Sequence, residues 1–259
     1  MSQNVRRLLE LTTRCIMNGF TIYQTGRAVG AMLLTLSMGV ALCGCGVESK
    51  QSDNGGTSSS QTQGGGRLAP SLKAYAAQLL SEHSSSMSDV QRSAVERVSR
   101  TGKVPASDYE TALSGYRQCM LARGYKEIIF LNTGGGLKEE AMHRSGTKQQ
   151  EEKYAQDSAD CWFAHGAGIA HLYETQIGNP SLLSDPMEAI VDCLKRKKLV
   201  DVSYSAEQLQ EERGKARKAA AGGDRRWLYS FEDSTESYAC RAANGWTSAD
   251  SSDPVEQLW

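Results

Sequence analysis

The sequence predicts a mainly α-helical domain of about six helices, held by two disulfide bonds and with room for one short strand. Ala, Gln, Glu, Lys and Arg dominate the C-terminal two-thirds, whereas aromatic residues make up 7% of the chain and proline occurs five times. Apolar residues in this part recur at helical spacing. Four cysteines, an even number, lie beyond residue 67.

The first expected helix is the segment PSLKAYAAQLLSEH, in which apolar residues fall on one face. The second is expected to open at Ser88 and to stop at Gly102, because Ser is a common N-cap and Gly favours the left-handed residue that ends a helix. The residues predicted to point inward are Leu72, Tyr75, Ala76, Leu79 and Leu80 in the first helix, and Val90, Ala94 and Val98 in the second.

The segment SDYETALSGYRQCMLARG follows the helical pattern along its whole length. Ser107 and Glu110 have the spacing of a capping box, and Gly124 stands where a left-handed residue would end the helix. The expected core residues of this third helix are Tyr109, Ala112, Leu113, Tyr116 and Met120.

The next segment, KEIIFLN, is read as a short strand or as an extended piece packed on the helices. The glycine run at 133–136 is read as a loop, with a phosphate cradle as the alternative. A long helix is then expected from Thr147 towards Gly178, disturbed near Gly166 and Gly168.

Three further helices are expected towards the C-terminus. Asp185 has the character of an N-cap and Pro186 suits the first helical position. The next two helices are expected from Ser205 and from about Asp233. The basic run KRKK, residues 195–198, complements the dipole at a helix end, with a role against an anionic wall polymer or membrane as the alternative.

Three short segments share one pattern, in which a large side chain follows a cysteine by six residues. They are CMLARGY from Cys119, CLKRKKL from Cys193 and CRAANGW from Cys240. We interpret all three as helix ends, with the cysteine in the last turn and the large residue folding back. A duplication is the alternative, but the sequences between the segments do not match.

Residues 1–44 are predicted to be a signal peptide. Four arginines precede residue 28 with Glu10 as the only acid before it, and residues 28–47 carry no charge. A positive lead followed by an apolar stretch of about 15 residues is typical of secretion signals. The lead is long, so translation from Met17 is an alternative to translation from Met1. A transmembrane helix over 28–47 is the structural alternative.

Leu42, Cys43, Gly44 and Cys45 close this stretch. They resemble the lipobox of bacterial prolipoproteins, although Ala or Ser is commoner at the place of Cys43. The resemblance implies a diacylglyceryl thioether on Cys45 and cleavage before it, which would anchor the protein to the outer face of the cell membrane. A plain cleaved signal and a C-x-C metal pair are the competing interpretations.

Residues 45–66 are predicted to comprise the lipidated cysteine and a flexible linker, because Gly, Ser, Gln and Thr leave hardly any apolar surface to bury. Residues 67–259 then form the disulfide-stapled helical domain. Removing residues 1–45 takes away four Arg and one Glu, which leaves 25 basic and 29 acidic side chains. This balance disfavours nucleic acid as a partner.

The domain contains Cys119, Cys161, Cys193 and Cys240, and an oxidising compartment favours their pairing. Four cysteines allow three pairings. We expect neighbours along the chain to pair, Cys119 with Cys161 and Cys193 with Cys240, each bond being worth roughly 4 kcal/mol in the chain-entropy model. Zinc bound by Cys161 and His165, one helical turn apart, is the alternative; no metal or cofactor is predicted.

The sequence contains no G-x-S-x-G, H-E-x-x-H or Walker A motif, and we predict no catalytic residue. His165 and His171 are candidate bases, with a packed or solvated histidine as the plainer interpretation. Three segments resemble uncharacterised lipoproteins of Gram-positive, especially actinobacterial, envelopes; they are DYETALSGYRQCMLARGY, YETQIGNP and AIVDCLKRKKLV. That resemblance implies no known activity.

We therefore expect a membrane-anchored monomer that binds an extracellular ligand or an envelope component. A cell-wall hydrolase, which would need His165 or His171 beside an acid in a cleft, is one alternative. A purely structural envelope protein is the other.

Overall fold

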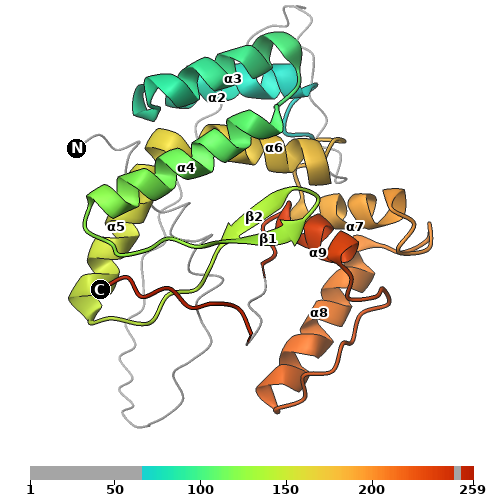
Figure 1. The fold of residues 1–259 in the computed structure, drawn as a ribbon. Helices are drawn as coiled ribbons and strands as arrows, with labels where there is room; N and C mark the ends of the chain where they lie inside the picture. The colour runs from blue at the N-terminus through green and yellow to red at the C-terminus, as the bar shows by residue number, and fades with distance from the viewer. Residues whose placement is uncertain (1–65, 248–251) are drawn as a thin grey trace, which may run out of the picture. The chain divides into compact units, whose positions relative to one another are not determined.

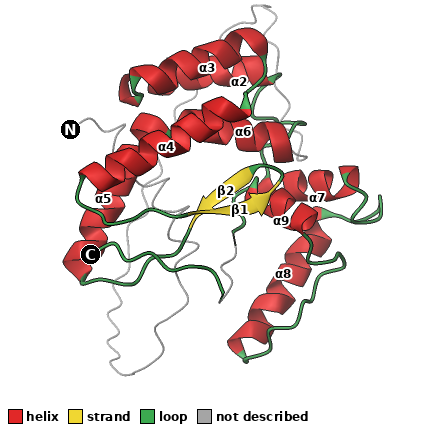
Figure 2. Ribbon diagram, viewed as in Figure 1, coloured by secondary structure: helices red, strands yellow, loops and turns green. Residues whose placement is uncertain are grey.

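The computed structural model describes residues 66–247 and 252–259, and the prediction of a mainly helical fold is confirmed there. The described elements are eight α-helices, one 3₁₀ turn and a two-stranded sheet (Figures 1 and 2), namely α2 (Leu72–His83), η1 (Ser84–Ser86), α3 (Asp89–Thr101), α4 (Ala106–Ala122), β1 (Phe130–Gly134), β2 (Leu137–Glu140), α5 (Lys148–His165), α6 (Ala167–Gly178), α7 (Pro186–Arg196), α8 (Ala206–Ala221) and α9 (Thr235–Ala242). We call residues 66–183 the first region, residues 186–247 the second region and residues 252–259 the C-terminal tail.

Most predicted helix ends are confirmed. The Ser88 side chain accepts from the N–H of Gln91, and α3 ends at Gly102 in the left-handed conformation. Asp185 caps α7 with Pro186 at its start, and Ser205 opens α8 with a full capping box.

Two expectations about α3 and α4 are wrong. No side chain caps α4, which starts after Pro105, and Glu110 binds Lys138 Nζ at 2.6 Å instead of closing a capping box with Ser107. Val90 does not face the core, because its side chain is 64% exposed. The buried position on this turn belongs to Gln91, which is 2% exposed.

The long helix expected from Thr147 to Gly178 is interrupted at Gly166 and forms α5 and α6, so the seven segments expected to be helical give eight described helices. The indole ring of Trp162 covers Gly166 so closely that a Cβ atom there would lie 2.6 Å from the ring. A side chain at this position would therefore displace the tryptophan, and Gly breaks the helix where the ring crosses it.

The strand expected in KEIIFLN is confirmed from Phe130 onwards, and it has a partner that the sequence did not reveal. β1 and β2 form an antiparallel hairpin whose turn holds the glycine run. These glycines are pressed against the helices: a Cβ atom would lie 2.4 Å from Thr235 at Gly134 and 3.0 Å from the Tyr173 hydroxyl at Gly136. The run therefore serves close packing between α6 and α9, not an open phosphate cradle.

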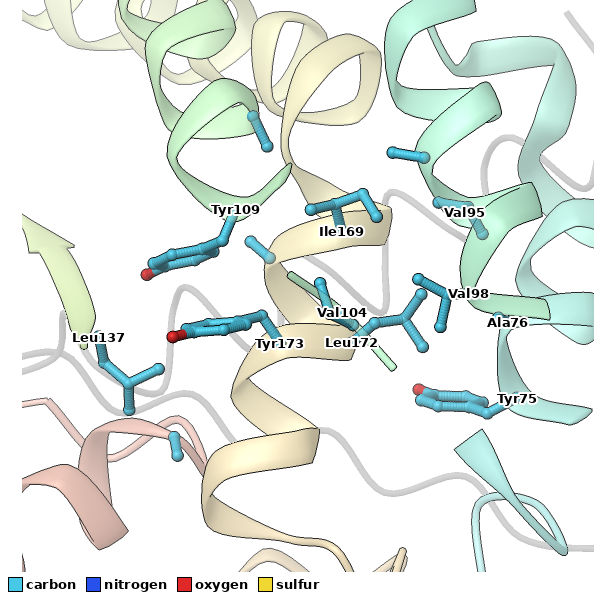
Figure 3. Close-up of a cluster of buried hydrophobic side chains, with 14 of the residues drawn as sticks. Tyr75, Ala76, Val95, Val98, Val104, Tyr109, Leu137, Ile169, Leu172 and Tyr173 are labelled. Carbon is cyan, nitrogen blue, oxygen red and sulfur yellow. The ribbon is translucent and has the colours of Figure 1, made fainter. Parts of the chain in front are cut away.

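The core of the first region gathers on α6, which α2, α3, α4 and α5 all contact. Figure 3 shows Tyr109 and Tyr173 stacked there, with ring centroids 4.4 Å apart, beside Ile169 and Leu172. All five core residues predicted for α4 are buried. A smaller cluster in the second region includes Ile190, Leu194, Leu209 and Phe231.

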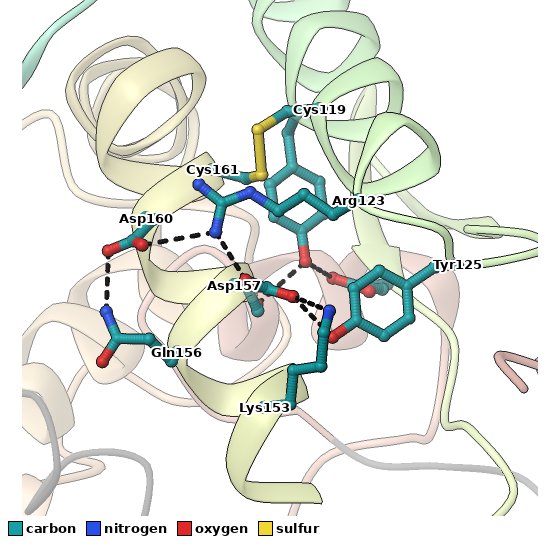
Figure 4. The surroundings of a disulfide bond; sticks show 11 residues. Cys119, Arg123, Tyr125, Lys153, Gln156, Asp157, Asp160 and Cys161 are labelled. Carbon is teal, nitrogen blue, oxygen red and sulfur yellow. Dashed lines mark hydrogen bonds and ion pairs between the residues drawn. A yellow bond between two sulfur atoms is a disulfide. The ribbon is translucent and has the colours of Figure 1, made fainter. Parts of the chain in front are cut away.

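The two disulfides have the expected pairing. Cys119 on α4 is bonded to Cys161 on α5, and Cys193 on α7 is bonded to Cys240 on α9, with Cα separations of 5.7 and 5.6 Å. Figure 4 shows ion pairs beside the first bond, where Arg123 Nη1 lies 2.6 Å from Asp157 and 3.3 Å from Asp160.

The three segments that begin with cysteine are helix ends, as the sequence predicted. In each, the residue six positions after the cysteine donates its N–H to the carbonyl five residues back, and the residue before it is left-handed. This is one of the two bonds of a Schellman cap. The donor–acceptor pairs are Tyr125 with Met120, Leu199 with Leu194, and Trp246 with Arg241, and the left-handed residues are Gly124, Lys198 and Gly245.

The C-terminal tail lies on the first region, although the second region precedes it in the chain. The Lys126 N–H donates to the Leu258 carbonyl at 3.2 Å, and the Glu256 N–H donates to the Met142 carbonyl at 2.9 Å. Leu258 is 1% exposed among the side chains of α4 and α5. The tail thus completes the core of a region that begins almost 200 residues earlier.

Candidate functional site

A groove of about 690 Å³ lies between α3 and α4, with the junction of α5 and α6 as its floor. α3 and α4 both pack on α6 rather than closely on each other, which leaves this space open. The volume suits a small molecule. The lining residues are Ser88, Val90, Gln91, Ala94 and Arg97 on one wall, Asp108, Glu110, Thr111, Ala112, Ser114, Gly115, Gln118 and Cys119 on the other, and His165 and Ile169 on the floor.

His165 is the last residue of α5, and its imidazole rests against the backbone of α4 at Gly115. A Cβ atom at Gly115 would lie 3.1 Å from Nδ1 and 3.3 Å from Cγ of this ring. Glycine inside a helix costs roughly 0.5–1 kcal/mol relative to alanine. Gly115 therefore lowers the stability of α4 at the position where the imidazole of His165 contacts this helix.

Gln91 holds the floor in place. Its Nε2 donates to the carbonyls of Phe163 and Ala164 at 2.8 and 3.0 Å, and its Oε1 accepts from the N–H of Gly168 at 2.8 Å. These backbone groups lose their helical partners where α5 breaks from α6. By satisfying both helix ends at once, Gln91 fixes the position of His165. The one sign of this bridging role in the sequence is that the amide side chain of Gln91 occurs among apolar residues at helical spacing.

Asp108 supplies an unused acceptor on the α4 wall. Its Oδ1 accepts from Arg97 Nη2 at 2.9 Å across the groove, whereas its Oδ2 is buried and has no hydrogen-bond partner among the described residues. A buried oxygen without a partner is costly, and a ligand N–H or O–H would remove that cost.

The ring nitrogens of His165 likewise make no hydrogen bond within the described residues, and three hydroxyl groups line the same walls. The groove thus offers an imidazole, a carboxylate oxygen, hydroxyls and amides around a floor of small side chains. Such a set can bind a polar molecule by hydrogen bonds and can exchange a proton with it.

The two candidate histidines are not brought together. His171 lies six residues further along the chain, on α6, and is exposed; its Nε2 is 2.7 Å from the hydroxyl of Tyr75. No carboxylate is hydrogen-bonded to either ring in the described part of the chain. The alternative of a zinc site at Cys161 and His165 lacks a thiolate ligand, because the Cys161 sulfur is bonded to Cys119.

The carboxyl groups with the most displaced pKa values lie outside this groove. Burial raises the pKa of Glu140, which accepts hydrogen bonds from the hydroxyls of Tyr116 at 2.6 Å and Tyr154 at 2.8 Å. Burial raises the pKa of Glu256 to about 8 and, with the nearby charge of Glu139, that of Glu174 to about 8.

We read these carboxyl groups as parts of the packing. Glu256 is fully buried and binds the Ile129 N–H at 2.5 Å through Oε1, while its Oε2 is without a partner in the described residues. Displaced pKa values can mark functional sites, but Glu140 and Glu256 lie where the C-terminal tail joins the hairpin and are closed in by protein.

The predicted lipidation site, Cys45, lies outside the described residues, as do the predicted signal peptide at 1–44 and the linker up to residue 65. Among the residues that are described, none of the helices has the length and apolar character needed to cross a membrane. The same residues hold no group of three His, Cys, Asp or Glu side chains placed to bind a metal ion.

Comparison with protein-family models, with curated proteins and with solved structures gave no match.

Proposed function

We propose that this protein is a lipid-anchored extracytoplasmic binding protein, which holds a small polar ligand in the groove between α3 and α4. A diacylglyceryl thioether on Cys45 attaches it to the outer face of the cell membrane, and it acts as a monomer. The observation that carries the binding role is the imidazole of His165, which rests on Gly115 at the floor of the groove with its nitrogens unpaired within the described chain.

Binding is a better account of this groove than hydrolysis. A hydrolytic histidine needs a nucleophile within hydrogen-bond distance and a third group that orients the ring. Within the described residues the ring of His165 is positioned by packing against Gly115 and by the Gln91 bridge instead. That arrangement suits a group that meets a ligand.

Mass spectrometry of the small molecules that copurify with the protein tests the groove. Ser114→Trp would fill the groove from an exposed position on α4, and Ser107→Trp places the same side chain on the same helix outside the lining. We expect a bound compound in wild type and Ser107→Trp, and its loss in Ser114→Trp and His165→Ala. The same set of compounds in all four proteins would contradict the proposal.

Labelled fatty acid tests the anchor separately. We expect the wild-type chain to incorporate the label in cells and Cys45→Ala to lose it, because the thioether needs the Cys45 sulfur. Cys43→Ala should keep the label and serves as the matched control, since it lies in the same motif. Equal labelling of wild type and Cys45→Ala would rule out the lipid on this residue.

A further inference from the structure

The second half of α8 adds nothing to the core. Leu209 is the only buried residue of this helix, which continues for about 18 Å beyond it. Figure 1 shows this end of α8 away from α7 and α9. Helices in proteins owe most of their stability to packing, so a projecting helix that buries one residue needs another explanation.

Positive charge is concentrated on this end. From Arg213 to Arg226 the chain carries six basic residues and one acid, Asp224. Asp224 is paired with Arg226 at 2.7 Å, and Arg213 lies over the ring of Trp246 at 4.5 Å. The other four form no ion pair with any described residue; they are Lys215, Arg217, Lys218 and Arg225.

The four free cations face solvent. Lys218 follows Leu209 by nine residues, or two and a half turns, and so points away from the buried side of α8. Lysine and arginine near the end of a helix also complement its dipole, but Arg225 lies beyond the helix, where the dipole does not account for it.

An exposed tryptophan lies in the loop that follows this end of α8. The loop after α8 turns back along the helix, because the Asp224 N–H donates to the Ala219 carbonyl at 2.9 Å and the Ser230 N–H to Glu212 at 3.2 Å. Trp227 in this loop is 37% exposed. Its ring is held by a hydrogen bond to the Phe231 carbonyl and by the guanidinium of Arg241 at 4.9 Å.

We propose that this surface, made of Lys215, Arg217, Lys218, Arg225 and Trp227, binds the anionic phospholipid headgroups of a membrane. Lysine and arginine are attracted to anionic headgroups, and tryptophan favours the membrane–water interface. The inference rests on the proposed lipid anchor in one respect: the predicted linker at 46–66 spans roughly 25 Å, which would keep the surface within reach of the membrane.

The test compares binding of the full chain to phosphatidylcholine vesicles with and without phosphatidylglycerol. We expect a preference for the anionic vesicles of roughly 100-fold, which falls as salt is added. Exchange of the four cations for Gln should abolish this preference. A matched variant that exchanges Lys73, Arg100, Lys103 and Lys126 for Gln removes the same charge from exposed positions elsewhere and should keep it.

The quantity measured is the ratio of binding to anionic vesicles over binding to neutral vesicles. This ratio does not depend on whether Cys45 carries a lipid, so it can still be measured if the proposed anchor is wrong. Brominated anionic lipid should quench the fluorescence of wild type more than that of Trp227→Phe. Unfolding by denaturant should be alike in both Gln variants, which shows that each is folded. An unchanged preference after the four exchanges on α8, an equal loss in the matched variant, or equally tight binding to soluble polyphosphate would overturn the proposal.

Discussion

The first and second regions are each closed by one disulfide, yet they differ in what else holds them. The bonds span 42 and 47 residues, so the chain-entropy model gives them nearly the same value. The larger cluster of the first region has nineteen buried residues, two of which, Ala239 in α9 and Ala243 just after it, come from the second region. The cluster of the second region has eight, including both of its cysteines. Loss of the crosslink should therefore allow local opening more readily in the second region, where the core is smaller.

Removal of each disulfide in turn is the strongest test of this difference between the regions. Exchange of either cysteine pair for alanine should lower the free energy of unfolding by roughly 4 kcal/mol. Without Cys193–Cys240 we expect hydrogen exchange to accelerate in α7, α8 and α9 while α4 and α6 keep their protection, because the second region would open by itself.

Loss of Cys119–Cys161 supplies the control for that experiment. This bond joins α4 and α5 in another cluster of the first region, with six buried residues, which Phe130 and Trp162 connect to the larger core. Its removal should therefore bring all helices of both regions closer to global unfolding together. If the variant without Cys193–Cys240 kept α7 to α9 protected, the difference between the regions would not exist.

The C-terminal tail packs on the first region and carries a buried carboxyl group there, that of Glu256. The pKa of Glu256 is raised by burial to about 8, against an ordinary value of about 4.3 in the unfolded chain. Below the ordinary value both states hold the proton. Between the two values the folded state resists losing its proton, so the free energy of unfolding falls as pH rises, by up to about 1.4 kcal/mol per pH unit.

Glu256→Gln removes the charge but keeps an oxygen for the Ile129 N–H. We expect the variant to equal wild type below pH 4 and to be more stable by up to about 4–5 kcal/mol at pH 8, measured by denaturant unfolding over this range. Glu96→Gln, at an exposed site on α3, should follow the wild-type curve. Parallel curves for wild type and Glu256→Gln would show that Glu256 ionises freely.

The predictions that held depend on local rules. Ser88, Asp185 and Ser205 cap helices because their side chains reach N–H groups two or three residues away. Cys119 and Cys161 were expected to pair because they are neighbours in the chain, and the fold places α4 against α5. The capping signals lie within four residues of sequence, and the disulfide prediction needed only the order of the cysteines along the chain.

The groove could not be predicted in the same way, because its parts come from distant segments. Gln91 serves a helix break more than seventy residues later, and Gly115 leaves room for a ring on another helix. Glu256 is buried by contacts with residues near 129 and 142. Such positions look ordinary until tertiary packing gives them a partner, and this is also why the inward position was wrongly given to Val90 instead of Gln91.

The contact between the two regions can be weakened at one atom. Gly178 at the end of α6 faces Ala243 after α9, and a Cβ atom at Gly178 would lie 2.2 Å from the Ala243 Cβ. Gly178→Ala should therefore cost about 1–3 kcal/mol through overpacking. Ala243→Gly removes the opposing Cβ atom, so the double variant should recover most of that loss in denaturant unfolding. No recovery would place the strain elsewhere.

The smallest expected effect on the free energy of unfolding comes from the residues that end one helix in each region. α4 ends with Gly124 at φ 97°, whereas α7 ends with Lys198 at φ 58°, and a side chain is strained in that conformation. Lys198→Gly should raise the free energy of unfolding by about 1 kcal/mol, and Gly124→Ala should lower it by a similar amount, since nothing lies within 4 Å of a Cβ atom there. Lys197, at φ −85°, is the matched control, because Gly at this site gains nothing from a left-handed cap. A stabilising Lys197→Gly would show that loss of charge from the basic run, and not the backbone of the cap, accounts for the gain at Lys198.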